Sequence, residues 1–204
     1  MIFSKNPLKR HQQIFNLIAP VYSALDNYVK KGFNKAIKNV LIEVDLSGKS
    51  VLDLGTGPGA WAALFKEHGA EKVHGIDFAQ KMIYRAQKRY SPEIHFSVGD
   101  ATNLNTFDDK SFDIVTASFM LHGFPRDYRE KILKEMKRIA RELIIVNDYY
   151  GKTPLIAQIL EYFEKSDYIN FKKTFCDELK THFQNIKRQK ASWGTSVYFA
   201  YIEN

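Results

Sequence analysis

The stretch VLDLGTGPGAWAALF, residues 51–65, joins a short apolar segment to an apolar, helix-like run through three glycines at alternate positions. Glycine adopts the positive φ angles of a tight turn and puts no Cβ atom between the backbone and a ligand. A strand, a glycine turn and a helix in this order indicate a site for a small molecule. The rest of the chain has to show which molecule it is.

Apolar runs and helical periodicities alternate after this turn. We expect five strands, at residues 50–54, 72–77, 94–100, 112–119 and 142–148. Between them we expect helices, at residues 60–69, 79–90 and 127–140. This alternation is typical of a parallel sheet that helices cover on both faces. The near-continuous apolar run LIIV fits a strand that is buried on both sides.

Both ends of the chain extend this unit. Residues 9–19 and 25–44 have helical periodicity, as do residues 153–165 and 171–184. Two final strands, 186–193 and 196–203, are joined by a very short Gly194-Thr195 link. Such a link can only form a hairpin, so we expect the last strand to run antiparallel to its neighbour.

Two phosphate-binding patterns compete for the glycine turn. The phosphate loop GxxxxGK[ST] is excluded, because no Lys-Ser/Thr pair follows these glycines. The looser dinucleotide pattern fits Gly55, Gly57 and Ala60, with Asp77 about 20 residues further on where a ribose-binding acid belongs. The turn alone therefore leaves a dinucleotide open.

Five segments of the chain bear on this choice: LDLGTGPG (52–59), VHGIDFAQKMI (73–83), SVGDATNL (97–104), FDIVTASFMLHGF (112–124) and GTSVYFAYIEN (194–204). Taken in order, they resemble the motifs of class I S-adenosyl-L-methionine (SAM)-dependent methyltransferases. The resemblance covers roughly residues 50–204, and a nicotinamide dehydrogenase does not predict the final hairpin. It implies SAM as the cofactor and S-adenosyl-L-homocysteine (SAH) as the product.

The resemblance also implies the fold and the domain organisation. The fold class is α/β, a Rossmann-like three-layer sandwich with a seven-stranded, mostly parallel sheet, an antiparallel last strand and the order 3-2-1-4-5-7-6. We expect a single methyltransferase domain over residues 1–204. Within it, residues 1–47 form an N-terminal helical lid and residues 48–204 the core.

Acidic residues at expected strand ends are the main candidates for binding SAM. Asp53 can order the ammonium group, Asp77 can accept from both ribose hydroxyls, and Phe78 can cover one adenine face. Asp100 can accept from the adenine amino group, and the Ala101 amide can donate to the ring. Each acid also has a local alternative: a cap of the turn for Asp53, a helix N-cap for Asp77 and a loop carboxylate for Asp100.

The remaining cofactor-binding candidates follow from the same resemblance. They are Tyr22, Gly55, Thr56, Gly57, Gly59, Met82, Ser118 and Phe119. The N-terminal IFNLIAPVYSALDNYV resembles ubiquinone/menaquinone-biosynthesis C-methyltransferases, in which a Tyr-Asp pair closes over the cofactor. Here Tyr22-Ser23 stands in that place, and both Tyr22 and Met82 have a packed core residue as their alternative.

Methyl transfer is an in-line displacement in which alignment does most of the work, and a base is needed only if the acceptor must lose a proton. His122, just after the fourth strand, is the catalytic candidate, with a pocket wall as the alternative. Aromatic residues favour a small, partly apolar acceptor: Phe119, Tyr149, Tyr150, Phe171 and Trp193. The motifs leave the acceptor atom and the oligomeric state open.

Composition excludes or disfavours several classes. No apolar run is long enough to span a bilayer, no signal peptide is visible and Cys176 is the single cysteine, so we expect a cytoplasmic protein. The histidines lack ligand spacing, which predicts no metal. The net charge of +7 keeps an RNA methyltransferase as an alternative, but the basic pairs are scattered. A catalytically silent SAM-binding adaptor is the other alternative.

Overall fold

The computed structural model describes residues 26–153, 166–192 and 194–203, together with Leu155, Gln158 and Glu161. The expected helix at 9–19, Tyr22 and Trp193 lie outside these residues.

Strands and helices alternate along the described chain as the sequence predicts. The strands are β1 (Ser50–Leu54), β2 (Lys72–Asp77), β3 (His95–Val98), β4 (Phe112–Ser118), β5 (Ala140–Tyr149), β6 (Ile186–Ser192) and β7 (Thr195–Tyr201). The helices are α2 (Asp26–Glu43), α3 (Ala60–Glu67), α4 (Gln80–Tyr90), α5 (Arg126–Ile139) and α7 (Tyr168–His182), with a 3-10 turn η1 (Leu121–Gly123) after β4.

The strands form one seven-stranded sheet in the order β3-β2-β1-β4-β5-β7-β6. The pairs from β3 through β5 are parallel, whereas β7 runs antiparallel to both β5 and β6. This arrangement confirms the predicted strand order and the closing hairpin. It also brings the carboxyl ends of β1 to β5 to one edge of the sheet, where open α/β sheets bind ligands.

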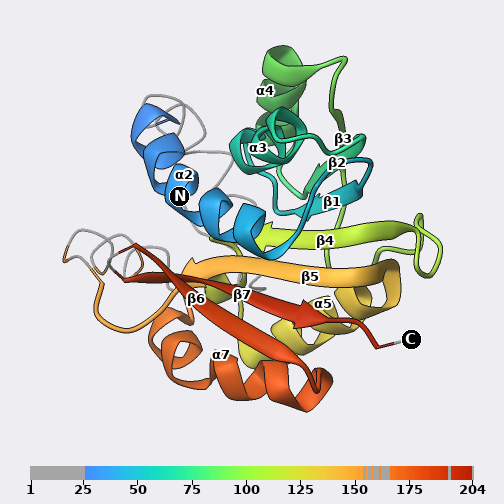
Figure 1. Ribbon diagram of the computed structural model, residues 1–204. Coiled ribbons are helices and arrows are strands. Elements are labelled where there is room, and N and C mark those ends of the chain that lie inside the picture. Colours follow the sequence, from blue (N-terminus) through green and yellow to red (C-terminus); the bar gives the residue numbers. More distant parts are fainter. Residues whose placement is uncertain are drawn as a thin grey trace.

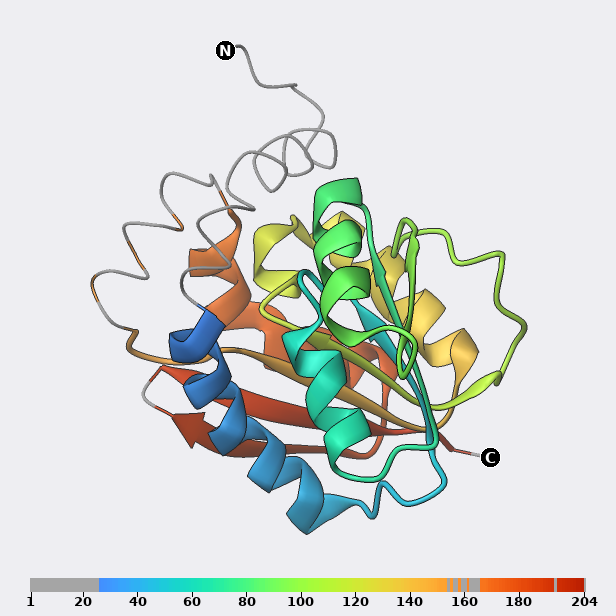
Figure 2. The same cartoon turned by 90° about the horizontal axis from the view of Figure 1, so that it is seen from above.

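Helices cover both faces of the sheet (Figures 1 and 2). Helices α2, α3 and α4 pack with one hydrophobic cluster, and α5 and α7 pack with the other. Successive residues of β1 show how the strand serves both clusters, because fully buried Val51 belongs to the first and fully buried Leu52 to the second. The apolar strands predicted from the sequence are therefore buried on both sides.

A buried ion pair joins the two helices of the second face. Arg129 of α5 is 1% exposed and donates to both carboxylate oxygens of Glu178 in α7, each at 2.7 Å. Its guanidinium also donates to Asp167 at 2.7 Å and to the Phe124 carbonyl.

Within the described ranges, no helix is long and apolar enough to cross a membrane.

Element boundaries differ from the predictions by a few residues. Strand β3 begins at His95 and α7 spans Tyr168–His182 where the sequence predicts a helix at 171–184. The turn η1 is not predicted at all, because three residues carry too little periodicity to be recognised. Of the helix expected at 153–165, the described Leu155, Gln158 and Glu161 are helical.

Candidate active site

The glycine turn leaves β1 at the sheet edge and enters α3 through three residues with positive φ. Gly55, Gly57 and Gly59 have φ angles of 63°, 54° and 87°. The Thr56 amide donates to the Ile76 carbonyl at 2.9 Å, which fixes the turn beside the end of β2. Gly55 and Gly57 thereby present bare backbone to the sheet edge, as close approach of a ligand requires.

Two buried carboxylates flank this turn. Asp77 ends β2, and its two oxygens accept from the Gly57 amide at 2.9 Å and the Ala79 amide at 2.8 Å. Asp53 is fully buried in β1 and accepts from the Thr56 hydroxyl at 2.7 Å through Oδ2. Its Oδ1 atom has no hydrogen-bond partner among the described residues, and the Ala62 amide lies near enough to the carboxylate to favour its ionised form.

Burial changes the acidity of both groups. It raises the pKa of Asp53 to about 7, against the opposing hydrogen bond from Thr56, and nearby Asp77 raises it further. Burial also raises the pKa of Asp77 to about 6, although the amides of Ala79 and Gly57 favour its ionised form. In both acids the cost of burying a charge outweighs the hydrogen bonds that favour the ionised form, and carboxylates shifted in this way are candidates for a functional site.

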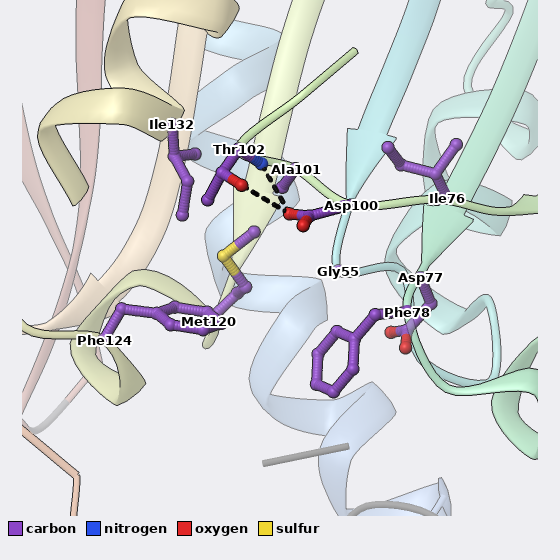
Figure 3. Close-up of a pocket in the computed structure, with 11 residues that line it drawn as sticks. Gly55, Ile76, Asp77, Phe78, Asp100, Ala101, Thr102, Met120, Phe124 and Ile132 are labelled. Atoms are coloured by element: carbon purple, nitrogen blue, oxygen red, sulfur yellow. Dashed lines mark hydrogen bonds between the residues drawn. The ribbon is translucent and has the colours of Figure 1, made fainter. Parts of the chain in front are cut away.

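The loop after β3 supplies a third carboxylate. Asp100 accepts from the Thr102 amide and the Thr102 hydroxyl, both at 2.8 Å through Oδ1 (Figure 3). This local bonding holds Asp100 and Ala101 at the same strand-end edge as Asp77. The loop-carboxylate alternative and a ligand role are compatible here, because each carboxylate oxygen has more than one acceptor site.

A small cavity of about 10 Å³ lies between these groups. Its lining residues come from the ends of β1 to β4, from the residue after η1 and from the middle of α5: Gly55, Ile76, Asp77, Phe78, Gly99, Asp100, Ala101, Thr102, Met120, Phe124 and Ile132. Met120 lies across the cavity from Asp77 and Phe78 (Figure 3). The structure thus brings together Gly55, Asp77, Phe78, Asp100 and Ala101 as the sequence predicts, while their ligand roles stay predictions.

Other candidates lie away from this cavity. Met82 is 1% exposed on the buried face of α4, and a Cβ on Gly59 would meet the rings of Phe96 and Tyr90 at about 3 Å. Ser118 accepts from the Asn147 amide side chain at 2.9 Å. These positions support the turn, the helix and the β4–β5 edge in this structure.

Phe119 has a left-handed backbone, with φ 47°, directly after β4. Its amide donates to the Asn147 carbonyl at 2.9 Å, and its ring stacks on Phe33 of α2 with centroids 5.9 Å apart. The ring of Tyr149 meets Phe119 edge-on at 5.2 Å. Non-glycine residues in this region are strained and are held there by their surroundings.

His122 of η1 lies between two carboxylates. Nδ1 is 2.7 Å from Asp148 Oδ1, and Nε2 is 3.2 Å from Glu161 Oε1. Burial lowers the pKa of His122, but the charges of Asp148 and Glu161 outweigh it and hold the pKa well above its usual value. The ring therefore carries a proton on each nitrogen, and in this arrangement it has no lone pair with which to accept another.

The predicted set of acceptor-binding aromatics needs a correction. Phe171 is fully buried and stacks on Phe175 within the second hydrophobic cluster, so it cannot line an acceptor pocket in this structure. Tyr150 is 37% exposed and lies 3.6 Å beneath the Arg188 guanidinium. Phe119 and Tyr149 remain together, half-buried, beside the strand-end edge.

Sequence reasoning missed three residues of this region. Met120 lies within a segment that resembles the methyl-donor motif, but its side chain had no assigned role. Asp148 is the last residue but one of β5, and its place at the strand-end edge could have suggested it. Glu161 meets His122 only through tertiary packing, and nothing in the local sequence signals that contact.

Comparison with known proteins defines the class to which this fold and site belong. The model of the methyltransferase domain family matches residues 51–142, from β1 into β5. The structure of a complex of DhpI with SAH has the same fold, with a TM-score of 0.73 and 16% identity, over 96% of this chain and 97% of that one.

Similarity to curated proteins shows to which group of methyltransferases the chain belongs. A demethylmenaquinone methyltransferase of Staphylococcus haemolyticus is 31% identical over 79% of this chain and 71% of its own length. One from Thermotoga maritima is 33% identical over 65% of this chain, which spans only 58% of that relative. The chain belongs to the class I SAM-dependent methyltransferases of the menaquinone-biosynthesis type.

Proposed function

We propose that this chain binds SAM and transfers its methyl group to a small, partly apolar acceptor, with SAH as the product. The observation that carries this proposal is the pair of buried carboxylates beside a bare glycine turn. Asp53 is fully buried with Oδ1 unsatisfied, which is costly unless a ligand donor completes it. An ammonium group fits that oxygen, and ribose hydroxyls fit Asp77.

In this proposal, each strand-end residue contacts a different part of the cofactor. Asp53 orders the ammonium group, Asp77 accepts from the ribose hydroxyls, and Phe78 covers the adenine. Asp100 and the Ala101 amide read the adenine edge. The further proposed contacts are Tyr22, Gly55, Thr56, Gly57, Gly59, Met82, Ser118 and Phe119, of which Tyr22 lies outside the described residues.

SAM supplies an activated methyl group on a sulfonium, so the chain's own task is to align the acceptor and exclude water. Half-buried Phe119 and Tyr149 offer apolar ring surface at the ends of β4 and β5 for this purpose. We assign His122 to positioning, because its two nitrogens hold Asp148 and Glu161 together. Proton loss from the acceptor, where it is needed, then falls to another group or to water.

A quinone-like acceptor is the first class to test. The relatives named above are demethylmenaquinone methyltransferases, and this supports a flat, partly apolar acceptor for the present chain as well. Because the chain spans little more than half of one of those relatives, the acceptor has to be established directly. A reduced demethylnaphthoquinone with a short side chain is a suitable probe.

Calorimetric titration with SAH and with NAD(H) tests the cofactor. SAH is expected to bind and NAD(H) not to, and the reverse result would overturn the proposal. Methyl transfer from radiolabelled SAM to the naphthoquinol then tests the enzyme. Binding of SAH without turnover on any acceptor class would favour the adaptor alternative.

The distribution of basic side chains gives little support to the alternative of an RNA methyltransferase. Many basic side chains of the described chain pair with acids, among them Lys49 with Glu142, Arg141 with Asp113 and Lys187 with Glu43. Salt-sensitive binding of RNA, measured with and without SAH, is the observation that would favour an RNA methyltransferase.

A further inference from the structure

The cavity beside the glycine turn is too small for the ligand that its lining suggests. Its volume of about 10 Å³ is room for one water molecule. Sites for small organic ligands typically enclose roughly 300–1,000 Å³. A nucleoside ligand can therefore enter only if part of the lining moves away.

Met120 is the lining side chain that covers Gly55. A Cβ atom built on Gly55 would lie 2.6 Å from Met120 Cγ and 3.1 Å from Met120 Cβ. The methionine thus rests directly on the bare backbone of the glycine turn. The missing side chain of Gly55 gives room to Met120 here, the same room that close approach of a ligand would use.

Of the lining residues, Met120 is also well placed to move. Ile76, Phe124 and Ile132 are at most 4% exposed and belong to the second hydrophobic cluster. Met120 packs against the same cluster but is half-buried, and it lies in the two-residue link between β4 and η1. Its unbranched side chain has three rotatable bonds, so it can leave the cavity by rotation of its own side chain.

Phe119, the residue before Met120, has an unusual backbone conformation that could change together with the position of Met120. Phe119 has a φ of 47°, which a non-glycine residue adopts only under constraint. Its ring packs against Phe33 of α2 and Tyr149 of β5, with centroids 5.9 Å and 5.2 Å apart, and its amide donates to the Asn147 carbonyl at 2.9 Å. A change of backbone at Phe119 would withdraw Met120 from Gly55 and disturb the contact with α2.

We propose that Met120 is a gate over the SAM site, held in the arrangement seen here by the contacts of Phe119 with Phe33 and Tyr149. The gate rests on the proposed SAM site and adds to it a regulated entry. Cofactor binding displaces Met120 and relaxes Phe119, and α2 senses the change through Phe33. Only the fraction of molecules with the gate open can accept ligand, so the closed gate lowers apparent affinity.

The test compares the wild-type protein with Met120→Ala and with Met120→Leu, which keeps the bulk. Association and dissociation of SAH are followed by stopped flow, and affinity by calorimetry. Trp61 serves as the reporter in a Trp193→Phe background, because its ring lies 5.3 Å from Phe33. Thermal unfolding checks that each variant is folded.

Removal of the gate is expected to raise the association rate of SAH about fivefold or more, whereas Met120→Leu stays near wild type. The slow change in Trp61 fluorescence on SAH addition should become fast in Met120→Ala. An unchanged association rate in Met120→Ala, with SAH binding intact in the wild type, overturns the gate alone. If neither protein binds SAH, the proposed SAM site fails and the gate with it.

Discussion

His122 Nδ1 lies 2.7 Å from Asp148 Oδ1 at the edge where β5 ends. Glu161 lies beside the other ring nitrogen, with its Oε1 atom 3.2 Å from Nε2. One buried cation therefore joins η1, β5 and the residues before α7. Since the three groups carry two negative charges and one positive charge, the imidazole proton is what keeps the carboxylates together.

The first prediction concerns the pH at which this cluster fails. The folded pKa of His122 lies above the unfolded value of about 6.5. The cluster therefore contributes its full stability below pH ~6.5 and loses it as pH rises through the folded pKa. Measured by urea unfolding, the stability difference between the wild type and His122→Asn should shrink with rising pH above that point.

A direct readout comes from NMR titration of the His122 ring. Its signals should remain those of an imidazolium at pH 7, and Glu161→Gln should shift the midpoint to lower pH because one of the two charges is lost. A wild-type midpoint near 6.5 would contradict the buried imidazolium and would make His122 available as a base again.

The second prediction concerns Asp77. Its side chain accepts from the Gly57 and Ala79 amides and is proposed to accept from two ribose hydroxyls as well. Asp77→Ala should weaken SAH binding by about 2–4 kcal/mol through loss of charge-assisted hydrogen bonds. Calorimetry measures this change, and Asp77→Asn separates charge from shape. Unchanged affinity in a folded Asp77→Ala protein would remove Asp77 from the site.

The sequence was sufficient for the fold because its signals are local. Strand β1, the glycine turn and α3 follow one another within residues 51–65, and each has its own pattern. The short Gly194-Thr195 link fixed the direction of the last strand in the same way. Strand ends then placed Asp77 and Asp100 at a common edge, as the cavity lining confirms.

The unpredicted parts of the site depend on contacts between distant segments. Glu161 reaches His122, and Met120 rests on Gly55, through packing that no local pattern records. The aromatic ring of Phe171 suggests an acceptor pocket, yet this residue lies on the buried side of α7 and belongs to the second hydrophobic cluster. The residue type is compatible both with a ligand pocket and with the protein core, and the burial of Phe171 shows that it belongs to the core.

The third prediction concerns the pH dependence of cofactor binding. Burial raises the pKa of Asp53 to about 7 and that of Asp77 to about 6 in the ligand-free protein. Ammonium and hydroxyl donors need these groups ionised, so SAH affinity should be constant above pH ~8 and fall as pH drops through 7 and 6. Calorimetric titrations across this range measure the profile, and Asp77→Asn should flatten its lower part.

Stability of the ligand-free protein should change in the opposite sense. Both acids have folded pKa values above their unfolded values, so their contribution to stability is present below pH ~4 and is lost as pH rises to about 7. Asp53→Asn should therefore reduce the pH dependence of thermal unfolding without SAH. A wild-type protein whose SAH affinity rises on acidification would contradict the ionised site.

The last prediction concerns Arg129, which holds α5 against α7. Because it is 1% exposed and bonded to Glu178, Asp167 and the Phe124 carbonyl, its loss leaves buried acceptors uncompensated. Arg129→Leu should lower the free energy of unfolding by about 3–5 kcal/mol in urea. Phe124 also lines the cavity, so the same variant should weaken SAH binding while the fold persists.

The double variant Arg129→Leu/Glu178→Leu removes both charges together and should recover a large part of the lost stability. If the double variant is instead as unstable as the sum of the two single variants, the ion pair does not act as a unit and the α5–α7 contact depends on apolar packing.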